Sequence, residues 1–364
     1  MEYMEQALSM AKLALGQASP NPAVGAVIVK DNEIVGSGYT QPPGSAHAEI
    51  VALEQAGENA RGGVMYVTLE PCHYFGRTPP CTTAIIEAGI TEVHIAMLDP
   101  NPLVNGKGRD VLENVGIKTF LGEQEAKARV INEAYIKYTL TGLPFITVKY
   151  AMSLDGKIAT FTGDSKWISG EESRHFVHNL RYKHDAIMAG VKTVLADDPQ
   201  LTARCGSGRG GTAKTQPLRI IIDGMVQTPV TAKVFTEPGK TLIVIARKAT
   251  EQEKEAYRNV GAEILEIPSE DDYIELEKLM VELGKRQIMS VLVEGGSILF
   301  GSLFDQKLVD KVVAFVAPII IGGGKAKTAI GGKGVEKIMD AVKLKNLREE
   351  QFGKDIMFMG YVEE

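Results

Sequence analysis

The chain has 364 residues, which is longer than one typical domain and therefore predicts two. Its 44% hydrophobic and 24% charged residues are typical of a soluble globular protein, and its net charge of −6 argues against broad nucleic-acid binding, which needs a basic surface. Three cysteines do not suggest a secreted disulfide scaffold, and no apolar run approaches the roughly 20 residues that span a membrane. We therefore expect a cytoplasmic protein that binds neither nucleic acid nor membrane.

The first part of the chain predicts two strands followed by alternating helices and strands. Apolar residues at helical spacing predict an opening amphipathic helix, at Met4, Leu8, Ala11 and Leu15. The pattern then predicts strands 24–29 and 34–39, helix 47–55, strand 64–69, helix 81–87, strand 93–98, helix 109–114, strand 117–121 and helix 126–139. This order indicates a mixed sheet with helices on both faces.

A boundary follows at Gly142-Leu143-Pro144, because glycine ends a helix and proline cannot continue it. We therefore predict one domain over 1–143 and a second over 144–364. In the second domain, the residue pattern predicts strand 145–150, helix 171–182, strands 186–189, 218–222 and 241–246, helices near 251–259 and 273–283, and strands 290–293, 311–317 and 356–361. This pattern is again α/β, with a glycine-rich loop at 206–216.

The residues with the clearest chemistry are His47, Glu49, Cys72 and Cys81. One imidazole and two thiolates supply three ligands to a tetrahedral zinc ion and leave a fourth position open, as in catalytic zinc sites. Zinc deaminases have the pattern H-x-E followed by P-C and a second cysteine, in which the glutamate transfers protons. A buried histidine with two ordinary core cysteines is the alternative. The joint order of the four residues favours zinc and assigns proton transfer to Glu49.

The spacing of the two cysteines departs from the common P-C-x-x-C pattern. Eight residues separate Cys72 from Cys81, namely His73-Tyr74-Phe75-Gly76-Arg77-Thr78-Pro79-Pro80. Glycine allows a tight turn there and the prolines stiffen the return, so both sulfurs can still reach one ion. The insert also adds a cation at Arg77, which suits a substrate with a phosphate group.

With this insert the first domain resembles the deaminase half of the bifunctional riboflavin-biosynthesis deaminase/reductase family. The resemblance rests on the motifs Asn21-Pro22-x-Val24-Gly25, His47-Ala48-Glu49, Gly76–Cys81 and Asp99-Pro100-Asn101-Pro102. The second domain resembles the reductase half of that family. The matching segments there are Lys149, 153–159, 163–168, Asp197-Asp198-Pro199 with Leu201 and Arg204, Glu294-Gly295-Gly296, and Ala317-Pro318 leading into 321–323.

The resemblance implies a cytidine-deaminase-like three-layer α/β/α domain followed by a dihydrofolate-reductase-like α/β domain. It implies zinc-dependent deamination of a phosphoribosylamino-pyrimidine to the corresponding uracil. The second domain would then reduce the ribosyl group to ribityl with NADPH. Family members often associate, so we expect a homo-oligomer.

The resemblance also implies roles for individual residues. In the deaminase it places substrate contacts at Asn21, Arg77, Asp99 and Asn101. His73 and Tyr74 stand where the family commonly has serine and then histidine, so base recognition there differs, and His73 is either a contact or a solvated loop residue.

In the reductase the resemblance implies two sets of contacts. Substrate contacts would be Lys149, Ser165, Arg181, Leu201, Arg204 and Glu294, with Arg181 and Arg204 as the candidates for the phosphate. Cofactor contacts would be Ala151, Trp167, Thr193, Asp197, Gly296 and Ser297. Asp197 is also our candidate catalytic residue, for ring opening or for orienting the nicotinamide. The alternatives are a surface cation for Arg181, an N-cap or turn residue for Asp197 and core packing for Trp167.

Three histidines of the second domain, His175, His178 and His184, are assigned no chemistry, because their spacing does not place all three on one helical face. Two other functions compete with the deaminase/reductase interpretation. One is a tRNA or nucleoside deaminase with an unrelated C-terminal domain, and the other is a metal-stabilised binding module without turnover. Glu49 argues against the second, because a structural site has no use for a carboxylate beside an open coordination position.

Overall fold

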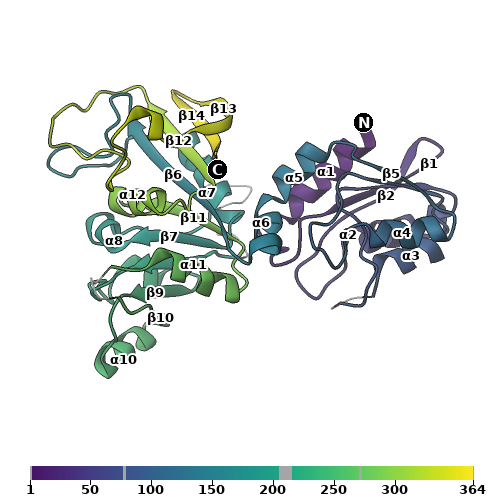
Figure 1. The fold of residues 1–364 in the computed structure, drawn as a ribbon, viewed down its shortest axis with the longest axis horizontal. Helices are drawn as coiled ribbons and strands as arrows, with labels where there is room; N and C mark the ends of the chain where they lie inside the picture. The colour runs from purple at the N-terminus through teal and green to yellow at the C-terminus, as the bar shows by residue number, and fades with distance from the viewer. Residues whose placement is uncertain (1, 77–78, 205–214, 270–272, 364) are drawn as a thin grey trace. The chain divides into compact units, whose positions relative to one another are not determined.

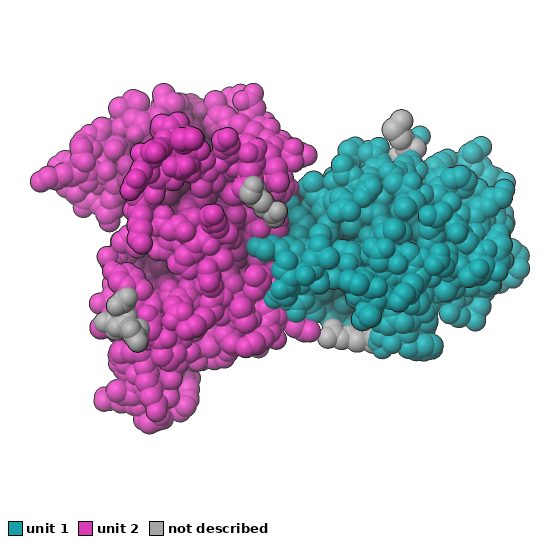
Figure 2. Space-filling model, in the orientation of Figure 1, with its two compact units in different colours: residues 1–142 teal, residues 143–364 magenta. Residues whose placement is uncertain are grey.

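The structure is a computed structural model that describes residues 2–76, 79–204, 215–269 and 273–363. The chain divides into two compact units, Met1–Gly142 and Leu143–Glu364 (Figure 2). This division falls at the glycine-leucine-proline sequence that ends the first pattern. None of the helices in the described ranges combines the length and the apolar character needed to cross a membrane.

The first unit is built on a five-stranded mixed sheet with strand order β2-β1-β3-β4-β5. Strand β1 is antiparallel to both β2 and β3, whereas β3, β4 and β5 are parallel. The elements are α1 (Glu2–Ala14), β1 (Gly25–Lys30), β2 (Glu33–Tyr39), α2 (Ala48–Ala56), η1 (Gly57–Ala60), β3 (Val64–Val67), α3 (Cys81–Glu87), β4 (Glu92–Ile95), α4 (Lys107–Asn114), β5 (Lys118–Leu121), α5 (Glu125–Ile131) and α6 (Glu133–Thr141).

Helices cover both faces of this sheet, with α1 and α5 on one side and α2, α3 and α4 on the other (Figure 1). Glycines allow the close packing. A Cβ atom on Gly25 would lie 2.0 Å from the carbonyl oxygen of Ala7 in α1. One on Gly38 would lie 2.4 Å from the carbonyl oxygen of Ala48 in α2. The predicted three-layer arrangement is thus confirmed, and α2 is held directly on β2, which fixes where its N-terminus lies.

The second unit contains a nine-stranded sheet of order β10-β9-β8-β7-β11-β6-β12-β14-β13. The first seven strands in this order, from β10 through β12, pair in parallel with their neighbours. Strand β14 is antiparallel to both β12 and β13. The elements are β6 (Phe145–Ser153), α7 (Glu171–Tyr182), β7 (Ala186–Gly190), α8 (Val191–Asp197), β8 (Leu218–Ile222), α9 (Lys233–Thr236), β9 (Thr241–Ile245), α10 (Glu251–Asn259), β10 (Ala262–Glu266), α11 (Leu276–Lys285), β11 (Ser290–Gly295), α12 (Ser297–Asp305), β12 (Lys311–Ala317), η2 (Ile338–Asp340), β13 (Leu344–Phe352) and β14 (Asp355–Val362).

The central parallel strands of this sheet are largely buried on both faces, as their continuous apolar runs require. All five residues of β9 are buried, for example. Val291 and Val293 of β11 pack in one core cluster with α11 and α12, whereas Ile187 and Ala189 of β7 pack in another on the opposite face. A third cluster joins α7 to β12 and β14. The face of α7 that does not enter this core is therefore available to a site beside β6 and β11.

One expectation about the elements is wrong. The predicted helix 126–139 is broken at Asn132, whose buried side chain accepts from the backbone N–H of Ala23 at 2.9 Å and donates to the carbonyl of Ala23 at 3.1 Å. The amide side chain thus pairs with a distant loop, and two short helices result. The edge strand β13 was not predicted, because its residues are nearly all exposed and lack an apolar alternation.

Candidate functional site

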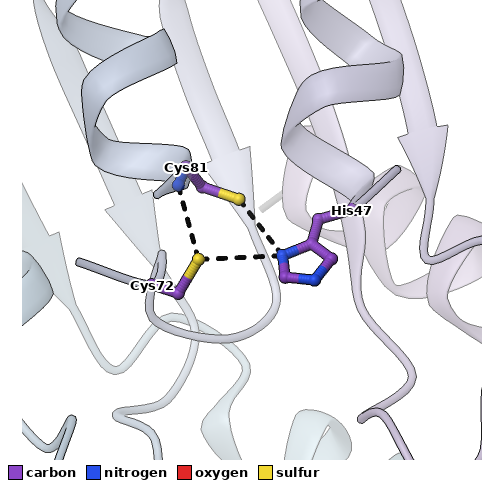
Figure 3. A group of neighbouring side chains, drawn as sticks. All are labelled: His47, Cys72 and Cys81. Carbon is purple, nitrogen blue, oxygen red and sulfur yellow. Dashed lines mark hydrogen bonds between the residues drawn. The ribbon is translucent and has the colours of Figure 1, made fainter. Parts of the chain in front are cut away.

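His47, Cys72 and Cys81 meet in the first unit, and their side chains point toward one another (Figure 3). The Nδ1 atom of His47 lies 3.3 Å from the sulfur of Cys81 and 3.7 Å from the sulfur of Cys72. Tetrahedral zinc with ordinary bond lengths to nitrogen and sulfur separates such atoms by about 3.6 Å. The three donors therefore fit one zinc ion, and their chemistry, one imidazole and two thiols, is that of a zinc site.

Each ligand is placed by the end of an element. His47 is the residue before α2, Cys81 is the first residue of α3, and Cys72 follows β3 by a short loop. The backbone N–H of Cys81 donates to the sulfur of Cys72 at 3.3 Å. The backbone N–H of Thr82 donates to the carbonyl oxygen of Cys72 at 3.1 Å. Hydrogen bonds from Cys81, and also from His47, lower the pKa of the Cys72 thiol. These hydrogen bonds therefore favour Cys72 as the thiolate that zinc requires.

Glu49 lies in the first turn of α2 and is only 4% exposed. Burial, together with the negative charge of Cys72, raises the pKa of its carboxyl to about 7. The carboxyl also hydrogen-bonds the Cys81 thiol. A carboxyl that exchanges its proton near neutral pH, next to an open ligand position, is suited to general acid–base catalysis.

Glu70 organises the loops around this site, and it was not predicted as a functional residue. Its buried carboxylate accepts from the backbone N–H groups of Asp99 at 3.2 Å, Gly106 at 2.9 Å and Arg109 at 3.1 Å. Gly108 lets α4 approach, since a Cβ atom there would lie 2.0 Å from the carbonyl oxygen of Pro71. Its position directly before Pro71-Cys72 could have identified Glu70 from the sequence. A carboxylate at the end of a strand is suited to accepting hydrogen bonds from the N-terminus of a neighbouring helix.

The predicted substrate residues of the first unit lie on two loops. Asp99 is 8% exposed and accepts from the backbone of Asn101 at 2.9 Å and from the hydroxyl of Tyr135 at 3.1 Å. Burial raises the pKa of Asp99, and the negative charges of Glu70 and Cys72 contribute. Asn21 is half-buried in the loop before β1, and Arg77 lies outside the described residues. Contact of these residues with substrate stays a prediction.

Three predicted residues of the second unit form one buried ionic cluster. Glu294, at the end of β11, pairs with Lys149 of β6 at 2.8 Å and accepts two hydrogen bonds from Arg181 of α7. The side chains of these three residues are 3%, 14% and 14% exposed, respectively. Burial alone would raise the pKa of Glu294, but the two cations outweigh it and lower that pKa. The cluster therefore holds two cations for one anion.

Arg204 is exposed and lies close to this cluster. Its guanidinium donates to Nε2 of His178 at 2.9 Å, and His178 shares the carbonyl of Thr202 with Arg181. His178 thus lies in this site, although we predicted no chemistry for it from its spacing on the helix. Leu201 is only 3% exposed, and its side chain packs in the core, so a substrate contact there would have to involve its backbone.

The remaining predicted residues fall into two groups. In the first, the hydroxyl of Ser165 donates to Asp197 at 3.1 Å, and Lys166 donates to the carbonyl of Asp197 at 3.0 Å. Asp197 is the last residue of α8 rather than a turn residue. Trp167 is 71% exposed, with the guanidinium of Arg174 4.8 Å from its ring centre, so core packing is excluded.

The second group lies where β11 meets α12. A Cβ atom on Gly295 would lie 2.8 Å from the side chain of Thr193, so Thr193 packs directly on this turn. Gly296 has a φ of 92°, a conformation that favours glycine, and Ser297 begins α12. Ala151 is half-buried on β6. Thr193 and Gly296 are thus brought together, and their contact with the cofactor stays a prediction.

Comparison with known proteins decides the family. The family model described as "RibD C-terminal domain" matches residues 144–358, and that described as "Cytidine and deoxycytidylate deaminase zinc-binding region" matches residues 1–97. The chain is 43% identical to the riboflavin biosynthesis protein RibD of Aquifex aeolicus, over 98% of this chain and 96% of that one. The chain belongs to the RibD family. RibD of Escherichia coli is 39% identical over 97% of each chain.

Solved RibD structures agree with this assignment. RibD from Acinetobacter baumannii superposes with a TM-score of 0.88 at 36% identity and covers 100% of this chain and 98% of its own. The Thermotoga maritima diaminohydroxyphosphoribosylaminopyrimidine deaminase/5-amino-6-(5-phosphoribosylamino)uracil reductase has a TM-score of 0.86 at 36% identity, with 99% and 98% covered. The predicted fold class and bifunctional RibD activity are confirmed. The alternative with an unrelated C-terminal domain is wrong.

Proposed function

We propose that residues 1–143 deaminate a diaminohydroxyphosphoribosylaminopyrimidine and that residues 144–364 reduce the resulting 5-amino-6-(5-phosphoribosylamino)uracil with NADPH. The substrates are those in the description of the Thermotoga maritima relative. The observation that carries the proposal is the meeting of His47, Cys72 and Cys81 beside the buried Glu49. The cationic cluster around Glu294 in the second unit supports the reductase half.

For deamination, zinc held by His47, Cys72 and Cys81 would acidify a water molecule toward neutral pH. Glu49 takes a proton from the attacking water as its oxygen bonds to the ring carbon that carries the amino group. It then returns that proton to the leaving nitrogen, ammonia departs, and the remaining hydroxyl proton passes to the ring nitrogen as the ring carbonyl forms. Asn21, Arg77, Asp99 and Asn101 hold the substrate from the surrounding loops. The raised pKa of Glu49 supports this role in both directions of proton transfer.

For reduction, hydride from NADPH and a proton from solvent convert the open-chain ribosyl group to ribityl. Arg181 and Arg204 attract the phosphate, while Lys149, Ser165, Leu201 and Glu294 shape the substrate side. Ala151, Trp167, Thr193, Gly296 and Ser297 contact the cofactor. Asp197 orients the reacting groups, and its hydrogen bond from Ser165 supports a location where the two sides meet.

A coupled assay tests this order of reactions. With the diamino substrate, ammonia release is expected to precede NADPH oxidation. A zinc chelator should stop both, because the chelated enzyme makes no uracil product. Supplying that uracil should restore NADPH oxidation in the presence of chelator. Oxidation of NADPH by the undeaminated substrate would contradict the order, and no oxidation with the uracil would contradict the reductase half.

We also propose that the protein self-associates through β13 and the segment before it. Strand β13 is an exposed edge strand, and large apolar side chains nearby are exposed, with Ile338 at 90%, Met339 at 77% and Leu347 at 58%. Such an edge is normally covered. Sedimentation at micromolar concentration is expected to show a dimer or larger species, and Ile338→Glu with Met339→Glu should shift it toward monomer. A monomeric wild type would contradict this proposal.

A reducing compartment such as the cytoplasm suits this function. Two of the three metal ligands are thiols, which must stay reduced to bind zinc.

A further inference from the structure

His178 occupies a central place between two arginines of the second unit. It lies on α7 one turn before Arg181, so both side chains emerge from one face of the helix. Its Nδ1 lies 3.1 Å from the carbonyl oxygen of Thr202, and Arg181 donates to the same oxygen at 3.0 Å. A carbonyl oxygen only accepts, so Nδ1 of His178 carries the proton. Nε2 is then a lone-pair acceptor.

Arg204 uses that acceptor. Its Nε and one terminal nitrogen lie 3.2 and 2.9 Å from Nε2 of His178. The guanidinium has five N–H donors, and the hydrogen bonds that Arg204 makes within the described residues use only its Nε and one terminal nitrogen. Burial, together with the charges of Arg181 and Arg204, lowers the pKa of His178 to about 4, which keeps the ring neutral at physiological pH.

The two arginines are therefore held in different ways. Arg181 is paired with the carboxylate of Glu294, which cancels much of its charge. Arg204 is held by a neutral ring, which fixes its direction without cancelling its charge. A carboxylate in the place of His178 would orient Arg204 equally well but would compete with a phosphate for it. The neutral acceptor thus leaves the full charge of Arg204 available to a phosphate.

We propose that His178 is a positioning residue that holds Arg204, at full positive charge, toward the phosphate group of the reductase substrate. This inference rests on the proposed function, because it assumes that Arg204 binds that phosphate. It assigns His178 an effect on substrate affinity rather than on the hydride-transfer step.

Four variants of the full chain test the proposal, in a reductase assay with the uracil substrate. His178→Phe removes both hydrogen bonds and is expected to raise KM about tenfold or more with little change in kcat, as for loss of a charged hydrogen bond. His178→Glu keeps an acceptor but adds a negative charge, and it should raise KM as well. His178→Gln keeps one donor and a neutral acceptor and should restore a KM near that of the wild type. His175→Phe, on an exposed position of the same helix, is the matched control.

Two further measurements separate the possible failures. Inorganic phosphate should inhibit the wild type competitively and inhibit His178→Phe more weakly. NADPH binding, followed through the fluorescence of Trp167, the only tryptophan, should be the same in all variants. If Arg204→Met leaves KM unchanged, the assumed phosphate contact is wrong. If Arg204→Met raises KM but His178→Phe does not, the role of His178 alone is wrong. Should the phenylalanine variant fail to fold, equal KM values for the glutamine and glutamate variants would overturn the proposal.

Discussion

Glu49→Gln is expected to reduce ammonia release by about 10²–10⁴-fold while zinc stays bound, because the amide cannot accept and return a proton. The substitution keeps the shape of the side chain, and the three zinc ligands are unchanged. Zinc content per chain, measured by atomic absorption, and ammonia release, measured with the diamino substrate, give the two results. The reductase activity with the uracil substrate should be unaffected.

The matched control is Glu54→Gln, the same substitution at an exposed position of the same helix. It should retain both activities, since Glu54 is remote from the proton path we propose. Normal deamination by Glu49→Gln with a full complement of zinc would remove Glu49 from the mechanism. Loss of zinc in that variant would instead assign the glutamate a role in holding the metal.

Glu294→Gln is expected to lower the free energy of unfolding of the second unit by about 3–5 kcal/mol, because it leaves Lys149 and Arg181 buried without a counter-charge. The reductase activity of this variant should also fall, since Lys149 and Arg181 are both predicted to contact substrate. Urea unfolding followed by the fluorescence of Trp167 reports on this unit, because the chain has a single tryptophan. Glu263→Gln breaks an exposed pair with Arg286 and should cost less than about 1 kcal/mol.

The same variant should change how stability depends on pH. The pKa of Glu294 is lower in the folded protein than in the unfolded chain, so its ionisation stabilises the fold above about pH 4.3. That contribution is lost as the pH falls from there through the folded-state pKa. Glu294→Gln lacks it, so the stability difference from the wild type should shrink in acid. A difference that stays constant from pH 7 to about pH 3 would show that the charge of Glu294 is not what stabilises this cluster.

The metal site and the alternation of helices and strands were predictable because both are local in the sequence. His47 and Glu49 are two residues apart, and Cys72 follows a proline at the end of a recognisable strand. The apolar runs of β7 and β9 indicate buried parallel strands without reference to anything distant.

The parts that could not be predicted depend on contacts between distant residues. Asn132 ends a helix only because Ala23, 109 residues away, offers it a backbone to pair with. His178 is held in the site by the carbonyl of Thr202, 24 residues away, and no sequence pattern shows which backbone carbonyl a distant side chain will bond. Strand β13 follows no apolar alternation because its side chains are exposed in the single chain.

The carboxylate of Glu70 has a consequence for the dynamics of the first unit. It bonds three amides on the loop of Asp99 and the start of α4, and it stands next to the proline that precedes Cys72. The loop that carries a metal ligand and the loop that is predicted to contact substrate are therefore anchored to one side chain. We therefore expect the amide hydrogens of Asp99, Gly106 and Arg109 to exchange together, as one cooperative unit of local unfolding. Metal retention and substrate access would then share a single opening free energy.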